Sequence, residues 1–281
     1  MCTALNYVSD CHYFGRNLDW THGYGEKIII TPEHFSIMFK NHKPITTHYA
    51  VMGMGIVRDN YPLYFDCVNN EGLCIAGLNF PDNAVYNEPV SGMDNIAAYE
   101  MMLWILCQCK STYDAKALLK NTNIINASFS DDLPVTPMHW IVSDKNKSIV
   151  IEPVREGVMV YDNPKGVLAN NPPFPEQMKN SDKDIPYSTS SESRFKRAVK
   201  IMEEAPCHLV EKDSVNMFFN MLSQVGIVKT TENSQYTIYS SCINATKGIY
   251  YYRLYENEVI YKTSFSEFEL SGNNVIHGNV C

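Results

Sequence analysis

The order of the predicted strands and helices is what most constrains the fold of this 281-residue chain. Apolar periodicity and turn signals predict six strands between residues 2 and 78, two helices between 97 and 120, and three strands between 139 and 162. Two more helices between 191 and 225 precede a last group of strands between 236 and 262. Strands and helices do not alternate singly, so the pattern predicts antiparallel sheets with helix layers outside them.

Local patterns place the ends of the helices. The apolar run over residues 97–109 predicts the first helix, with Asp94 or Asn95 as its N-cap. This helix is apolar on all sides, which indicates burial against a sheet. Ser190 or Ser191 is placed to cap the third helix.

Two long segments lack a regular pattern. Residues 121–137 are polar and irregular, and we expect a loop there that walls a pocket. Residues 162–190 contain five prolines among polar side chains. We expect a surface loop in this second segment and not a linker between domains.

The composition argues against several classes of function. Hydrophobic residues make up 45% of the chain and charged residues 19%, as in an ordinary globular protein. The formal net charge of −8 predicts no surface for nucleic acid. The longest apolar run, Met101–Cys107, is far shorter than the ~20 residues that cross a bilayer. No secretory signal precedes Cys2, so we expect a cytoplasmic protein without membrane insertion.

The nine cysteines and eight histidines indicate neither a metal nor a cofactor. The cysteines are scattered without a Cys-x-x-Cys pair, which argues against a zinc site and against a dithiol redox motif. The histidines form no His-Glu-x-x-His pattern. We expect free thiols, as in a reducing cytoplasm, and no metal or cofactor.

Cys2, directly after the initiator Met1, is the first candidate nucleophile. A side chain this small allows Met1 to be removed, and the thiol would then share its residue with a free α-amino group. Such an amine has an ordinary pKa of ~7.7–8.0, so much of it is a base near neutral pH. A thiol that carries its own base is an N-terminal nucleophile. Taken alone, a cysteine at position 2 is more commonly an ordinary residue.

The segment Phe14–Asp19 adds two charges close to Cys2 in the sequence. Arg16 is a permanent cation that favours a thiolate, and Asp19 is a carboxylate that can orient an amine. On a regular strand these two side chains face opposite sides of the sheet. Both therefore reach one thiol only where the strand ends or bulges. The alternative is a surface Arg–Asp pair at a strand end.

These residues match the motifs of a known family. Met1-Cys2-Thr3 followed by Phe-Gly-Arg-Asn-Leu-Asp resembles the choloylglycine hydrolases, the bile salt hydrolases and penicillin V acylases of the N-terminal-nucleophile superfamily. Further collinear matches cover nearly the whole chain: Gly77–Pro81, His139-Trp140, Val167–Pro172 and Ser193–Phe195. The resemblance implies a four-layer αββα sandwich in one domain over residues 1–281, with a mature chain that begins at Cys2.

The resemblance also implies a catalytic set: Cys2, Arg16, Asp19, Asn79, Asn170 and Arg194. Asn79 and Asn170 match the family's two asparagines at the oxyanion, where one donor changes the rate by ~10²–10³. Arg194 matches the arginine that completes the charged network.

Each of these matches has a simpler interpretation. Asn79 and Asn170 stand before prolines and could be turn formers only, and Asn171 could take the place of Asn170. Arg194 could be a solvated residue in the first turn of a helix, although a cation there opposes the helix dipole. His139 is expected to be structural, next to pocket-forming residues.

The implied reaction is amide hydrolysis through an acyl-thioester on Cys2. Glycine- or taurine-conjugated bile salts are the expected substrates, because Asn at position 79 is the bile salt hydrolase form where penicillin acylases often carry Tyr. Penicillin V or another N-acyl amide is the alternative. A catalytically silent relative that binds a small molecule is a further alternative.

By resemblance, Leu18, Phe129, Leu133 and Met138 line an acyl pocket. All four are apolar and suit the face of a steroid. Arg58 stands where close relatives have an apolar or aromatic residue. It either meets the anionic end of a conjugated substrate or extends into solvent.

The resemblance implies a homo-oligomer as well. In relatives a long insertion before the Ser193-Arg194 motif reaches a neighbouring subunit, and the usual assembly is a tetramer. Here only Pro173–Glu192 fills that interval, and it is polar and rich in proline. We expect this shortened assembly loop to give a weaker association, a dimer or a rearranged oligomer.

Overall fold

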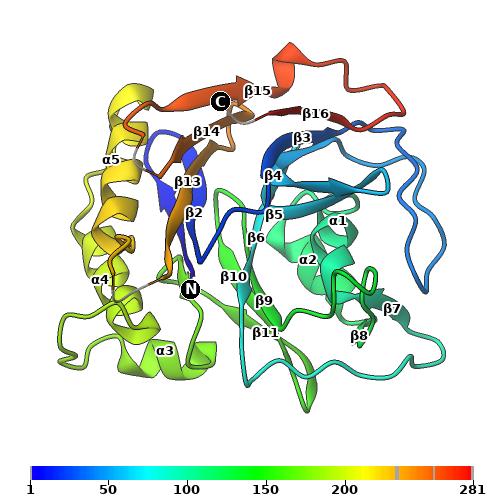
Figure 1. Ribbon diagram of the computed structural model, residues 1–281, viewed down its shortest axis with the longest axis horizontal. Helices are drawn as coiled ribbons and strands as arrows, with labels where there is room; N and C mark the ends of the chain where they lie inside the picture. Colours follow the sequence, from blue (N-terminus) through cyan, green and yellow to red (C-terminus); the bar gives the residue numbers. More distant parts are fainter. Residues whose placement is uncertain (1, 232–233, 256, 280–281) are drawn as a thin grey trace.

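The computed structural model describes residues 2–231, 234–255 and 257–279, which form four layers in the order helix, sheet, sheet, helix (Figure 1). Two large sheets lie face to face, and every strand pair within them that the structure describes is antiparallel. Helices cover the outer face of each sheet. This confirms the predicted α+β sandwich.

The six-stranded sheet, called sheet A below, carries the N-terminus. Its strand order is β12 (Val167–Ala169), β1 (Cys2–Val8), β2 (His12–Trp20), β13 (Tyr236–Asn244), β14 (Ile249–Leu254) and β15 (Tyr261–Ser264). Strand β2 is interior and covered on both faces, so eight of its nine residues are buried. Its polar side chains must therefore find partners inside the protein.

The eight-stranded sheet, called sheet B, has the order β11 (Gly157–Asp162), β10 (Ser148–Val154), β9 (Met138–Ser143), β6 (Cys74–Asn79), β5 (Tyr61–Asn69), β4 (Val51–Arg58), β3 (Lys27–Thr31) and β16 (Ile276–Asn279). Strand β16 pairs with β3 and was not predicted. Four residues are too few for a readable period of two.

The helices bury the faces that their spacing predicts. Helices α4 (Ser191–Glu204) and α5 (Glu211–Val225) cover sheet A. Helices α1 (Met101–Leu106) and α2 (Thr112–Leu119) lie on the side of sheet B, where α1 packs on β5 and β6. Ser190 caps α4 by accepting the N–H of Ser193, as predicted. Within the described residues, no helix has the length and apolarity needed to cross a membrane.

The first predicted helix is shorter than expected, and its predicted cap is wrong. Residues Asp94–Ala97 form strand β7, followed by a 3₁₀ turn, η1 (Ala98–Glu100), and then by α1. Strand β7 pairs in parallel with β8 (Thr122–Ile125). Asn95 is held by Val90 and Asn123 and caps no helix. A tertiary pairing has thus overridden the local capping signal.

Both segments predicted as loops contain regular structure. Strand β8 lies within residues 121–137, and the rest of that segment walls a cavity as predicted. Residues 162–190 contain β12 and helix α3 (Phe174–Asn180). Pro173 is the N-cap of α3 and Pro175 lies in its first turn, where a missing N–H costs no hydrogen bond. The prolines that suggested a loop begin a helix here.

Candidate active site

Strands β1 and β2 bring Cys2 next to the charged segment. Cys2 pairs with Leu18 and Ala4 pairs with Arg16, so the side chains of Cys2, Leu18 and Arg16 share one face of sheet A. On its other side β2 pairs with β13, and Gly15 allows the two strands to lie close together. A Cβ at position 15 would lie 2.0 Å from the carbonyl oxygen of Ser241. The site is thus set by the register of the hairpin.

A β-bulge in β13, the partner strand of β2, lies beside the charged segment. The sequence required an irregular strand there for Arg16 and Asp19 to reach one thiol. The pairing of β2 with β13 shifts between Thr237 and Tyr239, opposite Leu18 and Asp19. Both Arg16 and Asp19 line the same cavity as Cys2. The two charges therefore come close to one thiol although they belong to alternating positions of a strand.

Arg16 is buried between the two sheets. Its Nη1 donates to the carbonyl of Phe65 at 3.1 Å and to that of Gly77, both in sheet B. Burial by itself lowers the pKa of Arg16, but attraction to Cys2 and to acidic groups that include Asp66 outweighs it, and the pKa is raised. Asp66 is itself fully buried, where it accepts hydrogen bonds from two tyrosine hydroxyls. Arg16 is therefore a fixed cation beside Cys2.

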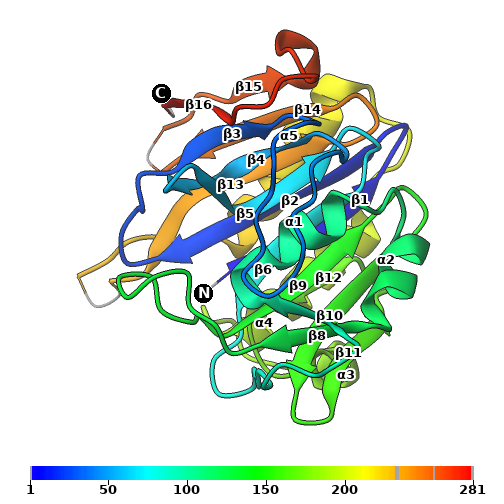
Figure 2. The same ribbon diagram turned by 90° about the vertical axis from the view of Figure 1, so that its right-hand side faces the viewer.

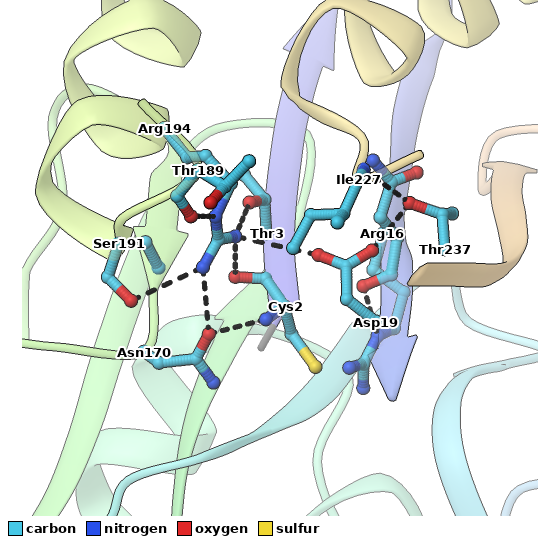
Figure 3. Close-up of polar contacts among 12 residues, drawn as sticks. Cys2, Thr3, Arg16, Asp19, Asn170, Thr189, Ser191, Arg194, Ile227 and Thr237 are labelled. Atoms are coloured by element: carbon cyan, nitrogen blue, oxygen red, sulfur yellow. Dashed lines mark hydrogen bonds and ion pairs between the residues drawn. The ribbon is translucent and has the colours of Figure 1, made fainter. Parts of the chain in front are cut away.

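Arg194, from the first turn of α4, is also fully buried and lies on the helix side of sheet A. Figure 3 shows its guanidinium at the centre of a network. Nη1 donates to the Cys2 carbonyl at 2.6 Å and to the Thr3 hydroxyl, and it lies 3.7 Å from Oδ2 of Asp19. Nη2 donates to Oδ1 of Asn170 at 3.2 Å. Arg194 is thus not the solvated helix residue of the alternative interpretation.

Asp19 balances the charge of Arg194. Its Oδ1 accepts the hydroxyl proton of Thr237 at 2.6 Å (Figure 3). Thr237 in turn accepts the N–H of Ile227. Burial raises the pKa of Asp19, while the charge of Arg194 and the Thr237 hydrogen bond oppose the rise. Arg194 and Thr237 therefore stabilise the ionised form of Asp19 against the effect of burial.

Asn170 contacts the nucleophile directly, and Asn79 lines the cavity beside it. Oδ1 of Asn170 accepts the N–H of Cys2, and its Nδ2 donates to the Asn79 carbonyl at 2.7 Å. Asn171 points elsewhere and accepts from Nδ2 of Asn83. The side chain of Asn79 lines the cavity and makes no hydrogen bond within the described part of the chain. The structure thus brings Asn170, and not Asn171, to Cys2.

A cavity of about 400 Å³ opens beside Cys2, and its walls are mostly apolar. All four predicted pocket residues line it: Leu18, Phe129, Leu133 and Met138. The loop after β8, which can be followed in Figure 2, supplies two of these four residues and lines the same cavity as Cys2. Arg58 is exposed at the end of β4 and is not among the lining residues. Its Nη1 lies 3.4 Å from the carbonyl of Val57.

Sequence reasoning missed two groups of residues around the site. Further cavity walls come from Trp20, Tyr24, Ile56, Tyr99, Met102 and Asp132. Thr3, Ser191 and Thr237 support the charged network. Thr3 was within reach of a sequence argument, since it belongs to the Met-Cys-Thr motif. Thr237 carries no such signal, because its partner Asp19 lies 218 positions away in the sequence.

The described residues include no group of three or more His, Cys, Asp or Glu side chains that could hold a metal ion. What the geometry offers is a thiol beside a buried cation, a backbone nitrogen held by an amide oxygen, and a free side-chain amide above an apolar cavity. This arrangement suits nucleophilic attack on the carbonyl of a largely apolar substrate.

Comparison with known proteins supports the same chemistry. The family model of linear amide C–N hydrolases, choloylglycine hydrolase family, matches residues 2–184 and 182–278. The chain belongs to the choloylglycine hydrolase family. As a member of this family, the chain is a hydrolase of linear amide C–N bonds, and it carries a cysteine at position 2.

Two relatives are similar to this chain over most of their length. A bile salt hydrolase/transferase of Lactiplantibacillus plantarum is 38% identical over 310 aligned residues, which cover 98% of this chain and 96% of that protein. A conjugated bile acid hydrolase of Lactobacillus gasseri is 37% identical, with 94% of this chain and 95% of that protein covered.

Solved structures of the family have the same fold. A mutant conjugated bile acid hydrolase from Clostridium perfringens superposes with a TM-score of 0.91 at 33% identity, covering 100% of this chain and 97% of that one. A penicillin V acylase from Agrobacterium tumefaciens shares the fold with a TM-score of 0.84 at 16% identity, covering 99% and 91%.

Proposed function

We propose that this choloylglycine hydrolase cleaves the amide bond of glycine- or taurine-conjugated bile salts with Cys2 as its nucleophile. The observation that carries the proposal is the position of Cys2, which lies at an apolar cavity with its nitrogen held by Asn170 and its carbonyl by Arg194. The names of relatives that are 35–38% identical support the choice of bile salts.

The proposal requires that Met1 be removed, and Met1 lies outside the described residues. The Cys2 nitrogen would then be an α-amine hydrogen-bonded to Asn170. In this state the amine takes the thiol proton, and the sulfur attacks the amide carbonyl. Arg16 stabilises the negative charge on sulfur, since it is a cation on the same face of the sheet.

The oxyanion that forms on the substrate is stabilised by the free Nδ2 of Asn79. Asn170 keeps Asn79 in place, because its own amide is bonded to the Asn79 carbonyl. The C–N bond then breaks, the α-ammonium gives its proton to the leaving nitrogen, and glycine or taurine departs. Water, deprotonated by the same amine, attacks the acyl-thioester, and the C–S bond breaks to release the bile acid.

The apolar walls of the cavity are proposed to bind the steroid, at ~25 cal/mol for each Å² removed from water. The exposed position of Arg58 favours its extension into solvent, so the proposal gives it no contact with the substrate. Penicillin V is the alternative substrate, but the penicillin V acylase resembles this chain in fold alone at 16% identity.

Substrate preference is the direct test of this proposal. The value of kcat/KM for glycine- and taurine-conjugated bile salts is expected to exceed that for penicillin V by roughly tenfold or more, because a pocket shaped for one apolar group discriminates to this degree. Release of the amine product measures all three reactions under the same conditions. A higher kcat/KM for penicillin V would reverse the assignment. Turnover of neither class would indicate a different N-acyl amide.

The assembly is a further proposal, and it concerns the short segment Pro173–Glu192. This segment forms α3 and a polar turn and exposes Tyr187. We expect a homo-oligomer whose subunits associate more weakly than in a tetramer, either a dimer or a rearranged oligomer. The reason is that this short segment leaves little chain to reach a neighbouring subunit. Light scattering at low micromolar concentration measures this, and a tight tetramer would contradict it.

The eight described cysteines form no disulfide, which supports action in the reducing cytoplasm.

A further inference from the structure

A buried pair outside the catalytic set lies behind the cavity. His139 on β9 and Glu152 on β10 occupy adjacent strands, with Nδ1 and Oε1 3.2 Å apart and side chains that are 0% and 1% exposed. Burial lowers the pKa of His139 against the opposing effect of its hydrogen bond and charge interaction with Glu152. Such a pair contributes little net stability, because desolvating the carboxylate offsets its attraction to a donor. The position of the pair, between two segments of the site, indicates its role better than its contribution to stability does.

On one side the pair supports the segment that carries Asn79. The ring of His139 stacks on the ring of Phe80, with centroids 4.3 Å apart and planes 5° from parallel. Phe80 follows Asn79 directly and is fully buried, and its N–H donates to the carbonyl of Pro137 at 2.8 Å. The ring of His139 therefore fixes the end of β6 where the free amide of Asn79 begins.

On the other side the pair supports the segment that carries Asn170. Oε1 of Glu152 also accepts the N–H of Phe174, the first residue of α3, at 2.8 Å. Phe174 is itself buried and lies four residues after Asn170. The pair thus contacts the chain just after the turn that presents Asn170.

We infer that His139 and Glu152 are positioning residues that fix the segments of Asn79 and Asn170 relative to each other and so set the oxyanion site. The inference rests on the proposed hydrolysis at Cys2. Two direct bonds join the segments, from Nδ2 of Asn170 to the Asn79 carbonyl and from Nδ2 of Asn83 to Oδ1 of Asn171. Both bonds lie at the turns themselves, whereas the pair contacts the buried residues Phe80 and Phe174 behind them. A displacement near 1 Å at such a site costs ~10²-fold in rate.

The first test separates positioning from general damage. His139→Ala is expected to lower kcat by about 10- to 100-fold with little change in KM, since the acyl pocket is intact. The rate of Cys2 alkylation by iodoacetamide should stay the same, because that reaction forms no oxyanion. A Cys207→Ser background removes from this assay the one exposed thiol among the eight described cysteines. Unchanged kcat, or an equal loss of alkylation, would overturn the inference.

Conservative variants separate the two contacts of His139. His139→Phe keeps an aromatic ring against Phe80 and loses the bond to Glu152, whereas His139→Gln keeps a donor and loses the stack. Both are expected to fall between wild type and His139→Ala in kcat. They also keep the test decisive if the alanine variant fails to fold.

His12→Ala is the matched control. His12 is another buried histidine, 2% exposed, and its Nε2 contacts Asn6 and Ser143 away from the cavity. This variant is expected to lose stability as His139→Ala does and to keep kcat. An equal fall of kcat in both variants would mean that kcat reports only stability, which would contradict the inference.

Hydrogen exchange gives a readout without any substrate. Backbone amides of residues 79–83 and 169–174 should exchange faster in His139→Ala and in Glu152→Ala, and should not change in His12→Ala. Faster exchange in only one of the two segments would overturn the inference. If the wild-type enzyme cleaves no bile salt, the proposed function fails, and the exchange data still decide whether the pair joins the two segments.

Discussion

Cys2→Ala is expected to abolish amide hydrolysis, with a loss of at least about 10⁴-fold in kcat, as for other enzymes that lose their nucleophile. No described side chain can replace the thiol, because the other groups at this end of the cavity are Arg16, Asp19 and Asn79. Cys2→Ser should also lose most of the activity, since a hydroxyl ionises far less readily than a thiol. Release of glycine or taurine from conjugated bile salts measures both variants.

Two controls make this result specific. The matched variant is Cys207→Ser, which removes an exposed cysteine and should leave kcat unchanged. Intact mass of the active enzyme should show that Met1 is absent. Full activity in Cys2→Ala would contradict the mechanism, and full activity in a chain that retains Met1 would contradict the role of the α-amine.

Much of the fold was predictable from the sequence, because the order of strands and helices permits few architectures. Runs of antiparallel strands separated by helix pairs lead to two sheets with helices outside, and the structure has this arrangement. The errors concern helix α3, the length of the first helix and several short strands. Strands β7, β8, β12 and β16 have three or four residues each, and a partner strand far away in sequence selects them. The local sequence pattern does not show whether a distant strand will pair with such a short segment.

The site was predictable where a residue belongs to a contiguous motif. Cys2, Arg16 and Asp19 lie on one hairpin, whose register puts Cys2 and Arg16 on one face, and the bulge in β13 lies opposite Asp19. Arg194 and Asn170 were placed by resemblance, and the structure brings both to Cys2. Spacing alone could not have done this, because the pairing of β12 with β1 and the packing of α4 on β1 join segments that are far apart in the sequence.

The supporting residues were not predictable. Thr237 reaches Asp19 from 218 positions away in the sequence, and only the bulge in β13 gives it that position. His139 looked structural because a histidine at a strand start has no signal of its own. Its significance depends on Phe80 and Glu152, which other strands bring to it, and on the bond from Phe174 to Glu152.

Arg194→Met is expected to abolish activity and also to destabilise the protein, by about 3–5 kcal/mol, because removing one partner of a buried ion pair leaves the other charge poorly compensated. The guanidinium holds the Cys2 carbonyl, Asp19 and Asn170 together, and methionine can hold none of them. The free energy of unfolding in urea and the hydrolysis rate measure the two effects. Wild-type stability in this variant would contradict the importance of the network.

The pH dependence of that loss identifies its cause. Burial raises the pKa of Asp19, and the charge of Arg194 opposes the rise, so Arg194→Met raises this pKa further. A carboxyl with a higher pKa in the folded state binds more protons there than in the unfolded state, so stability falls as pH rises above the unfolded value of ~3.9. The stability difference between variant and wild type should therefore be smaller at pH 4 than at pH 7. Adding Asp19→Asn to Arg194→Met removes the buried charge and should recover stability at pH 7 without recovering activity. A stability loss that is the same at both pH values would show that Arg194 acts by packing and not by its charge.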